Sequence, residues 1–483
     1  MKEVTKEHHP LYEELCSIIG PEYVSDEEFV RRSYTRAASY GMMARVRGKT
    51  PGIAVRPGST EEISEIVKLA NKTRTPVVPK GGGGSISIFP PFYVGTEENI
   101  LIDTTRINKI LEIDEDYMTV TTECGIILSR LSSEVRKKGF HLYTTDVPVH
   151  MDTVGGVLSG FIGGGEPSDL ATSGVMNRYV LGLKVVLPTG DIIQTGSGPG
   201  TNIHQNKVLH REAGTPDMTG MFIGDGGSFG IKTEATFTIR PFPSSYLVGV
   251  YDMGTSFENL WKAFSKLVAT DPFPYTRLLV FHRQGGTWFM VYIIRGHTDE
   301  ETGLKEKILG EICVSCGGEP AESRDVMELA SSFSARDLSK SVLPKGAAMT
   351  YFGEALIPRL RTREYLDDLN SMIDKVSKDL GIVERADFIV PYLRAMTITG
   401  VLLYLSRETQ KGDRSERLFE LMATQFPNLL LEKFGGFTES AQGESALLNA
   451  SVWSPTYKSY MKTLKKALDP NNILMPDLWG LGL

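Results

Sequence analysis

The chain has 483 residues, of which 41% are hydrophobic and 23% charged, so it has enough apolar surface to fold and is not disordered in bulk. Its formal net charge of −7 argues against a nucleic-acid binder, because such proteins are usually basic. The charged N-terminus lacks the apolar segment of a secretory signal, and no apolar run approaches the roughly 20 residues that span a membrane. We therefore expect a cytoplasmic protein.

The four cysteines are too few for a disulfide-rich framework. Cys313 and Cys316 form one CxxC pair, whereas Cys16 and Cys124 are single and distant in sequence. A zinc or iron–sulfur site needs further Cys or His ligands at matching spacing. We therefore expect no metal site and interpret the CxxC pair as structural, with a redox or metal role as the alternative.

The first 243 residues show alternating strand and helix patterns. Residues 1–50 favour helix, with apolar residues at helical spacing from Tyr12 to Ile19. Ser59 and Glu62 form a capping box ahead of an amphipathic helix. Residues 188–190 form the turn of a hairpin. Strands are predicted at 53–55, 76–79, 100–103, 118–123, 180–187, 191–195 and 231–240, and helices at 59–70 and 127–138.

Composition changes after Pro241-Phe242-Pro243, where glycine becomes scarcer and longer elements follow. A hairpin is predicted from strands at 277–282 and 287–294, then a helix at 362–380, a strand at 395–405 and a helix at 456–468. These patterns predict an α+β unit at residues 1–243 and a second at 244–430. We expect the C-terminal segment, residues 431–483, to pack back on the first unit.

Glycine is concentrated in the first unit: 25 of the 49 glycines lie in residues 81–230. They form three clusters, at 81–84, 155–165 and 224–230. The first cluster follows a predicted strand, and consecutive residues without side chains can align their N–H groups into a nest for an anion. We therefore predict an anion-binding loop suited to a pyrophosphate at Lys80 to Ser85. A purely structural loop is the alternative.

Three familiar glycine motifs do not fit. A dinucleotide-binding GxGxxG needs a third glycine or alanine, but Ile86 and Phe229 stand at the corresponding positions. The Gly48-Lys49-Thr50 end of a P-loop lacks its first glycine at the right distance. Residues 226–230 match the hydrolase pattern GxSxG around Ser228, but that motif requires a following helix, and a strand is predicted instead.

The glycine clusters and their flanks together resemble a known family. Residues 50–243 are similar to the FAD-binding domain of the vanillyl-alcohol-oxidase / p-cresol-methylhydroxylase (PCMH) superfamily, nearest its glycolate/D-lactate dehydrogenase branch. The likeness rests on PVVPKGGG (76–83), TVGG (153–156), GV (174–175), YVLG (179–182), FGI (229–231) and the terminal LDPNNILMP (468–476). The resemblance implies an α+β fold in which a two-subdomain PCMH-type FAD-binding domain carries an α+β cap domain for substrate.

The resemblance also implies which residues hold FAD. The pyrophosphate would lie on backbone N–H groups of Lys80, Gly81, Gly82, Gly83, Gly84 and Ser85. The flavin and ribityl chain would be lined by Pro148, Thr153, Gly155, Gly156 and Ser159, and the flavin–adenine path by Gly174, Val175 and Ile231. Some members attach FAD through a histidine in the first glycine loop. Gly84 and Ser85 stand there in this chain, so we expect noncovalent FAD.

The substrate residues depart from the branch pattern. The strand that carries the metal histidines of the branch corresponds to residues 394–400, which contain none. Oxidation of an alcohol by flavin needs a base and a group that stabilises charge. The candidates in the cap are His282, Arg283, Tyr392 and Arg394, with His297 as a further histidine. Outside the cap, His150 precedes the second glycine cluster and could approach the flavin. The alternative for each is a solvated or packing residue.

These features predict an FAD-dependent oxidoreductase that oxidises an alcohol or 2-hydroxy acid by hydride transfer to flavin N5. Electrons would pass to oxygen, a quinone or a protein carrier. The alternative is a flavin-carrying electron-transfer subunit of a larger complex with a degenerate substrate pocket. A homo-oligomer or a redox complex is compatible with either hypothesis.

Overall fold

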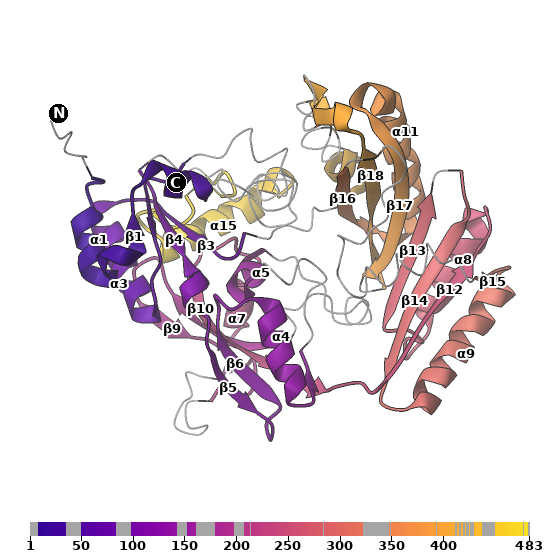
Figure 1. The fold of residues 1–483 in the computed structure, drawn as a ribbon, viewed down its shortest axis with the longest axis horizontal. Helices are drawn as coiled ribbons and strands as arrows, with labels where there is room; N and C mark the ends of the chain where they lie inside the picture. The colour runs from indigo at the N-terminus through magenta and orange to yellow at the C-terminus, as the bar shows by residue number, and fades with distance from the viewer. Residues whose placement is uncertain are drawn as a thin grey trace.

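The computed structural model describes residues 8–34, 50–83, 98–142, 152–160, 179–197, 207–212, 214–283, 285–321, 347, 349–392, 394–410, 413–414, 417–418, 421, 425, 429–436, 450–476 and 478–481. Two sheet-containing regions are visible, an N-terminal region and a cap region, and the first and the last described helices both lie on the N-terminal region (Figure 1).

The N-terminal region begins with a four-stranded sheet of order β1-β2-β4-β3, in which β2, β4 and β3 are parallel. Its strands are β1 (Val24–Ser25), β2 (Ile53–Val55), β3 (Val77–Lys80) and β4 (Ile100–Asp103). Apolar side chains fill both faces, as expected of a parallel sheet, with α1 (Tyr12–Ile19) and α3 (Thr60–Thr73) on one of them. The predicted capping box is confirmed in part: Ser59 accepts the N–H of Glu62, but the Glu62 carboxylate accepts from Gly58.

The second sheet of this region is antiparallel, with order β5-β6-β10-β8-β9. It consists of β5 (Ile110–Asp114), β6 (Thr119–Glu123), β8 (Val180–Val186), β9 (Ile192–Gln194) and β10 (Ile231–Thr238). The predicted hairpin around residues 188–190 is present as β8 and β9. Smaller elements complete the region: α2 (Glu28–Ser33), α4 (Leu128–Lys137), α5 (Val154–Gly160), α7 (Met218–Met221), β7 (Phe140–His141), β11 (Arg240–Pro241) and the 3₁₀ turns Pro21–Tyr23 and Thr104–Arg106.

The cap region is built on a seven-stranded sheet of order β15-β12-β14-β13-β17-β18-β16. Its strands are β12 (Ser245–Asp252), β13 (Arg277–Arg283), β14 (Trp288–Gly296), β15 (Glu319–Pro320), β16 (Met349–Pro358), β17 (Ile382–Tyr392) and β18 (Met396–Leu405). Three helices, α8 (Phe257–Ala269), α9 (Asp299–Ser315) and α11 (Thr362–Leu380), pack on one face. That face is turned away from the N-terminal region (Figure 1).

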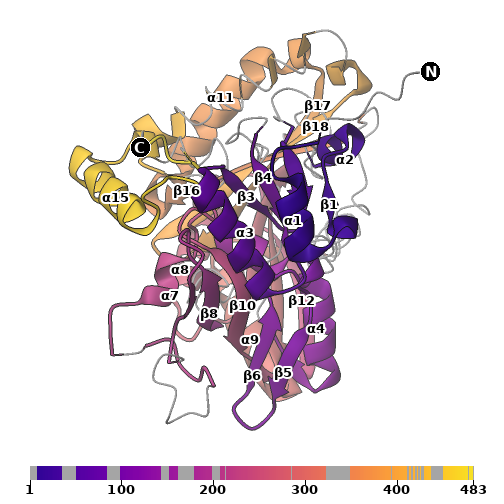
Figure 2. The same ribbon diagram turned by 90° about the vertical axis from the view of Figure 1, so that its left-hand side faces the viewer.

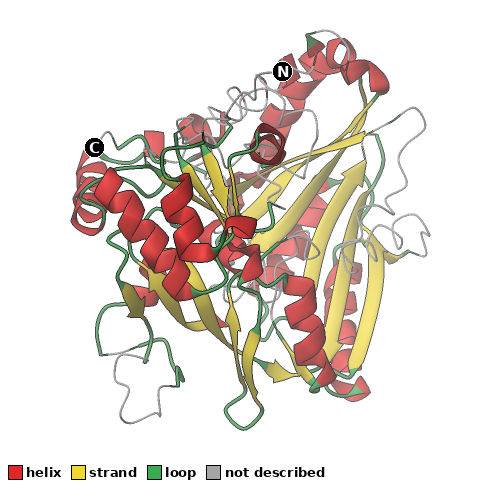
Figure 3. Cartoon of the chain, turned by 60° about the vertical axis from the view of Figure 1, so that its left-hand side comes forward, coloured by secondary structure: helices red, strands yellow, loops and turns green. Residues whose placement is uncertain are grey.

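The opposite face of the cap sheet is covered by none of the described helices and is called the helix-free face on that basis. It carries its own apolar cluster, which includes Phe281, Phe388 and Tyr392. Packing in the cap extends through the π-helix Leu429–Phe434, past residue 430 where the sequence analysis ends this domain. Short 3₁₀ turns at Arg359–Arg361 and Arg407–Gln410 link its elements. The strands and helices of the chain are distinguished in Figure 3.

The C-terminal segment lies on the N-terminal region. Helix α15 (Pro455–Leu468) is followed by a tail that runs parallel to β3, where Val77 N–H donates to the Ile473 carbonyl and Met475 N–H to the Val77 carbonyl. Leu478 and Trp479 pack in the same core as α4 and α5. The tail therefore borders the strand that leads into the first glycine cluster (Figure 2).

Candidate cofactor-binding site

The first two glycine clusters meet where β3 ends. A Cβ atom on Gly81 would lie 2.1 Å from Thr153 Oγ1 and 3.6 Å from Gly156 Cα, at the start of α5. Only a residue without a side chain lets the two backbones approach this closely. Gly83 follows with φ +75°, a conformation that other residues rarely adopt. These residues form a backbone cradle that a Cβ atom would fill.

Helix α5 presents a face of small residues. Val154, Val157 and Leu158 are buried, whereas Gly155, Gly156 and Ser159 are half-buried and lie on the other side of the helix. Ser159 Oγ donates to the Gly155 carbonyl at 2.8 Å, and Thr153 Oγ1 accepts the Gly156 N–H at 3.3 Å. Because the Thr153 and Ser159 hydroxyls bond within the helix segment and the other residues of this face are glycines, a ligand could approach the backbone closely.

The third glycine cluster docks on the end of α5. The N–H groups of Gly224 and Gly226 donate to the carbonyls of Leu158 and Ser159. Gly227 has φ +79°, and a Cβ there would lie 2.9 Å from Pro79 Cγ on β3. The described parts of the three glycine clusters therefore converge on one place.

Ser228 is not a nucleophile in this arrangement. It is fully buried, its Oγ donates to the Asp225 carbonyl at 2.7 Å, and strand β10 follows it directly. The hydrolase motif requires an exposed serine before a helix. The exclusion of this motif is confirmed.

Two buried lysine–aspartate pairs hold the convergence together. Lys232 Nζ lies 2.6 Å from Asp225 Oδ1, and Asp225 also accepts N–H bonds from its own loop. Lys465 of α15 donates to Asp469 at 2.7 Å and to the carbonyls of Ser228 and Leu474. Neither pair is predicted from the sequence, because lysine is ordinarily exposed and nothing in the local pattern marks these two.

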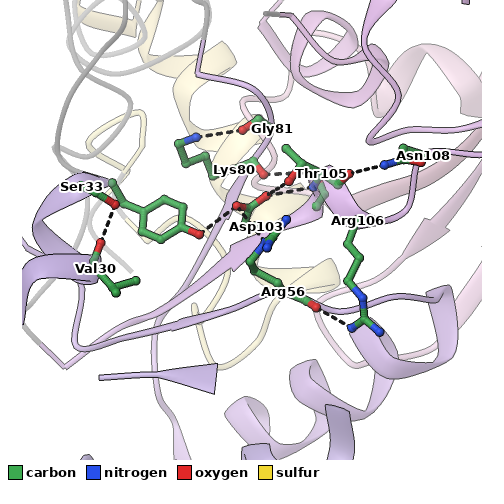
Figure 4. Close-up of polar contacts among 11 residues, drawn as sticks. Val30, Ser33, Arg56, Lys80, Gly81, Asp103, Thr105, Arg106 and Asn108 are labelled. Carbon is green, nitrogen blue, oxygen red and sulfur yellow. Dashed lines mark hydrogen bonds and ion pairs between the residues drawn. The ribbon is translucent and has the colours of Figure 1, made fainter. Parts of the chain in front are cut away.

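A charged cluster lies beside the first glycine cluster (Figure 4). Asp103, at the end of β4, accepts from Tyr34 Oη and Thr105 N–H, and Arg56 Nε lies 3.7 Å from its carboxylate. Lys80 Nζ donates to the Gly81 carbonyl at 2.9 Å. Burial lowers the pKa of the Lys80 ammonium, opposed by the nearby Asp103 carboxylate.

Asp152 stands immediately before the second cluster and is 6% exposed. Its Oδ2 atom has no hydrogen-bond partner in the described part of the chain. Burial raises the pKa of this carboxyl to about 7. The site therefore contains a buried carboxyl group that is mostly protonated, and so uncharged, below about pH 7.

His282 lies on the helix-covered face of the cap sheet. Its Nδ1 is 3.1 Å from Asp387 Oδ2, and its ring stacks on Trp288 with centroids 4.2 Å apart. Asn370 of α11 donates to the same Asp387 oxygen at 3.3 Å. These contacts favour a role for His282 in joining α11 to the sheet.

The other cap candidates differ in position. Arg394 Nη1 donates to the carbonyls of Val268 and Thr270, so this guanidinium holds the end of α8. Exposed His297 lies at the end of β14. Arg283 is described by its backbone, opposite Ala386 in register. Tyr392 is the candidate whose side chain packs on the helix-free face.

The described residues contain no group of three His, Cys, Asp or Glu side chains that could hold a metal ion. No described helix is long and apolar enough to cross a membrane. Cys313 and Cys316 are buried free thiols, and burial raises the pKa of Cys313 to about 12.

Comparison with known proteins agrees with this geometry. Residues 51–196 match the family model of the FAD binding domain. Glycolate oxidase subunit GlcD of Bacillus subtilis is 26% identical over 96% of this chain and 95% of its own length. A D-lactate dehydrogenase of Anaerostipes hadrus is 31% identical over 44% of this chain and 40% of its own length. The structure of p-cresol methylhydroxylase matches with a TM-score of 0.73 at 16% identity, covering 97% of this chain and 96% of that one.

The chain is an FAD-binding oxidoreductase. The resemblance to the PCMH superfamily and the predicted α+β fold class are both confirmed. The backbone cradle at Gly81 and Gly227 and the half-buried ammonium of Lys80 fit the diphosphate of FAD.

The structure brings most described FAD candidates together. Lys80, Gly81, Thr153 and Gly156 meet directly, and Gly82, Gly83, Gly155 and Ser159 continue the same two segments. Ile231 is the first residue of β10, paired with Val186 and buried. Six other candidates lie outside the described residues: Gly84, Ser85, Pro148, His150, Gly174 and Val175.

Proposed function

We propose that this oxidoreductase binds FAD noncovalently and oxidises an alcohol or a 2-hydroxy acid. Electrons pass to oxygen, a quinone or a protein carrier. The observation that carries the proposal is the convergence of three glycine clusters on the end of β3, where Gly81 leaves no room for a side chain beside Thr153. The similarity to a glycolate oxidase subunit and to a D-lactate dehydrogenase supports the substrate class.

The N–H groups of the loop after Lys80 hold the diphosphate, and the small-residue face of α5 receives the flavin. When bound, FAD supplies the hydride acceptor of the reaction. Lys232 and Lys465 hold the third glycine cluster in place, because the first donates to the Asp225 carboxylate and the second to the Ser228 carbonyl.

On the substrate side, Tyr392 is the candidate we favour. It lies on the helix-free face of the cap sheet, which is turned toward the N-terminal region (Figure 1). A phenol there orients a substrate hydroxyl by hydrogen bonding. The apolar side chains around it, Phe388 and Val390 among them, favour a substrate with an apolar body.

The test is spectroscopic. The purified protein is expected to absorb near 450 nm and to release FAD on acid treatment. Anaerobic mixing with a panel of alcohols and 2-hydroxy acids should bleach this band for at least one member. A protein that folds but takes up no FAD on reconstitution would overturn the proposal, and covalently retained flavin would overturn its noncovalent part.

A second candidate is a flavin-carrying subunit of a larger redox complex. The Bacillus subtilis relative, which this chain matches over nearly its whole length, is itself named as a subunit. Bleaching that requires an added partner protein would favour this candidate over the first.

A further inference from the structure

The ammonium of Lys80 lies inside the first glycine cluster. Its Nζ donates to the Gly81 carbonyl and lies 3.1 Å from the position that a Cβ on Gly83 would occupy. The side chain therefore folds over the loop whose N–H groups form the proposed nest (Figure 4). The positive charge therefore lies close to the backbone of Gly81 and Gly83.

Among the described residues, this ammonium has no acidic partner at ion-pair distance. It contacts the Gly81 carbonyl and the Tyr34 ring, whose centroid is 5.4 Å away. A half-buried cation with one neutral acceptor is costly unless a further anion satisfies it. Burial lowers its pKa, which is the expected consequence of that cost.

The nearby carboxylate does not fill this role. Asp103 Oδ1 accepts the N–H and hydroxyl of Thr105, and Oδ2 accepts from Tyr34 Oη at 2.9 Å. The positive charge of Arg56, whose Nε lies 3.7 Å from Asp103 Oδ2, balances this carboxylate. Because Asp103 is already satisfied, Lys80 stays available to a ligand.

We propose that the Lys80 side chain is an ionic anchor for the diphosphate of FAD, additional to the backbone nest, and that it makes this protein select a flavin with phosphates over one without. The inference rests on FAD binding and is independent of the substrate. Charged hydrogen bonds to phosphate are roughly twice as strong as neutral ones.

The experiment measures the affinity of the flavin-free protein for FAD and for riboflavin, by quenching of flavin fluorescence. We expect Lys80→Met to weaken FAD binding by about tenfold to a hundredfold, the range for a lost charge-assisted bond. Riboflavin, which has no phosphate, should bind equally to both proteins. Lys80→Arg should retain most of the FAD affinity.

Lys72→Met is the matched control, because Lys72 is an exposed lysine on α3 and its loss changes the net charge equally. It should leave both affinities within twofold of wild type. If Lys80→Met does not fold, Lys80→Gln, which keeps a donor for the Gly81 carbonyl, replaces it in the same assay.

An unchanged FAD affinity in the Lys80 variant would overturn the inference, and so would an equal loss of FAD and riboflavin affinity, which indicates a structural role. Wild-type protein that binds no FAD at all would instead contradict the proposed function.

Discussion

Lys232 and Asp225 form an ion pair at 2.6 Å in which neither side chain is more than 1% exposed. Asp225 also holds its own glycine loop through the N–H groups of Gly227 and Phe229. One buried pair thus connects strand β10 to the segment that docks on α5.

Removing one partner of this pair should be strongly destabilising. We expect Lys232→Met to lower the free energy of unfolding by about 3–5 kcal/mol, because Asp225 is left as an uncompensated buried charge. The double variant Lys232→Met/Asp225→Asn should recover part of the loss. Lys184→Met, which breaks the half-exposed pair with Glu234, is the control and should cost about 1 kcal/mol or less. Urea unfolding measures all four proteins, and equal effects of the two single variants would contradict the prediction.

Lys465 should hold the tail on the flavin site. It donates to the Ser228 and Leu474 carbonyls and to Asp469. We expect Lys465→Met to increase the rate of FAD release and to expose the C-terminal segment to limited proteolysis, because two carbonyls and a carboxylate lose their buried donor. The neighbouring Lys466 is exposed, so Lys466→Met should behave as wild type in both assays. Protection from proteolysis equal to wild type in Lys465→Met would argue against this function of the tail.

Asp152 should make stability depend on pH. Its pKa in the folded protein is about 7, above the value near 3.9 of an unfolded aspartate, so the folded state binds the proton more tightly. The associated stability is fully present below about pH 4 and is lost as pH rises toward 7, up to about 4 kcal/mol in total. Asp152→Asn should remove this loss.

The measurement is urea unfolding of wild type and Asp152→Asn between pH 4 and pH 8, at equal flavin occupancy. The variant should gain stability relative to wild type as pH rises. Asp116→Asn, at an exposed turn, should follow the wild-type profile. Parallel profiles for wild type and Asp152→Asn would show that the carboxyl is ionised in the fold.

Gly81→Ala should abolish or greatly weaken FAD binding, because the new Cβ would lie 2.1 Å from Thr153 Oγ1, a buried atom bound to Gly156 N–H. Adding Thr153→Ala removes the clashing oxygen and should restore part of the affinity. Gly303→Ala, in open space on α9, is the control and should be neutral or slightly stabilising. Flavin fluorescence titration reads all variants, and an unchanged affinity in Gly81→Ala would refute the close contact.

Tyr392 and His282 should differ in their effects on flavin reduction. Tyr392→Phe is expected to slow anaerobic bleaching by a substrate at least tenfold, about 1.4 kcal/mol, without changing FAD affinity. His282→Gln should leave the bleaching rate within about twofold and instead lower the unfolding midpoint, because it breaks the contact with Asp387. Stopped-flow absorbance measures the bleaching rate and thermal unfolding measures stability. A slow bleaching rate in His282→Gln with a normal rate in Tyr392→Phe would indicate that His282, not Tyr392, acts on the substrate.

Much of the fold could be predicted from local pattern. The strands that end at Lys80 and begin at Ile231, the hairpin around residues 188–190 and the helix at 362–380 lie where apolar periodicity places them. The glycine clusters also indicate the predicted cofactor region, because several glycines in one short segment can be recognised without knowledge of the fold. Strands β16 and β17 are not predicted from the sequence.

The glycine clusters could be recognised in the sequence, and they predict a place where backbone comes close to backbone or to a ligand, because these residues have no Cβ atoms. Which charged side chains support that place depends on how distant elements pack. Asp225 with Lys232, Lys465 with the tail, and Lys80 beside an occupied Asp103 are joined by burial and by contacts between distant elements. The face of the cap sheet on which a residue lies was likewise decided by the tertiary structure, because helices cover one side of the sheet and leave Tyr392 on the other.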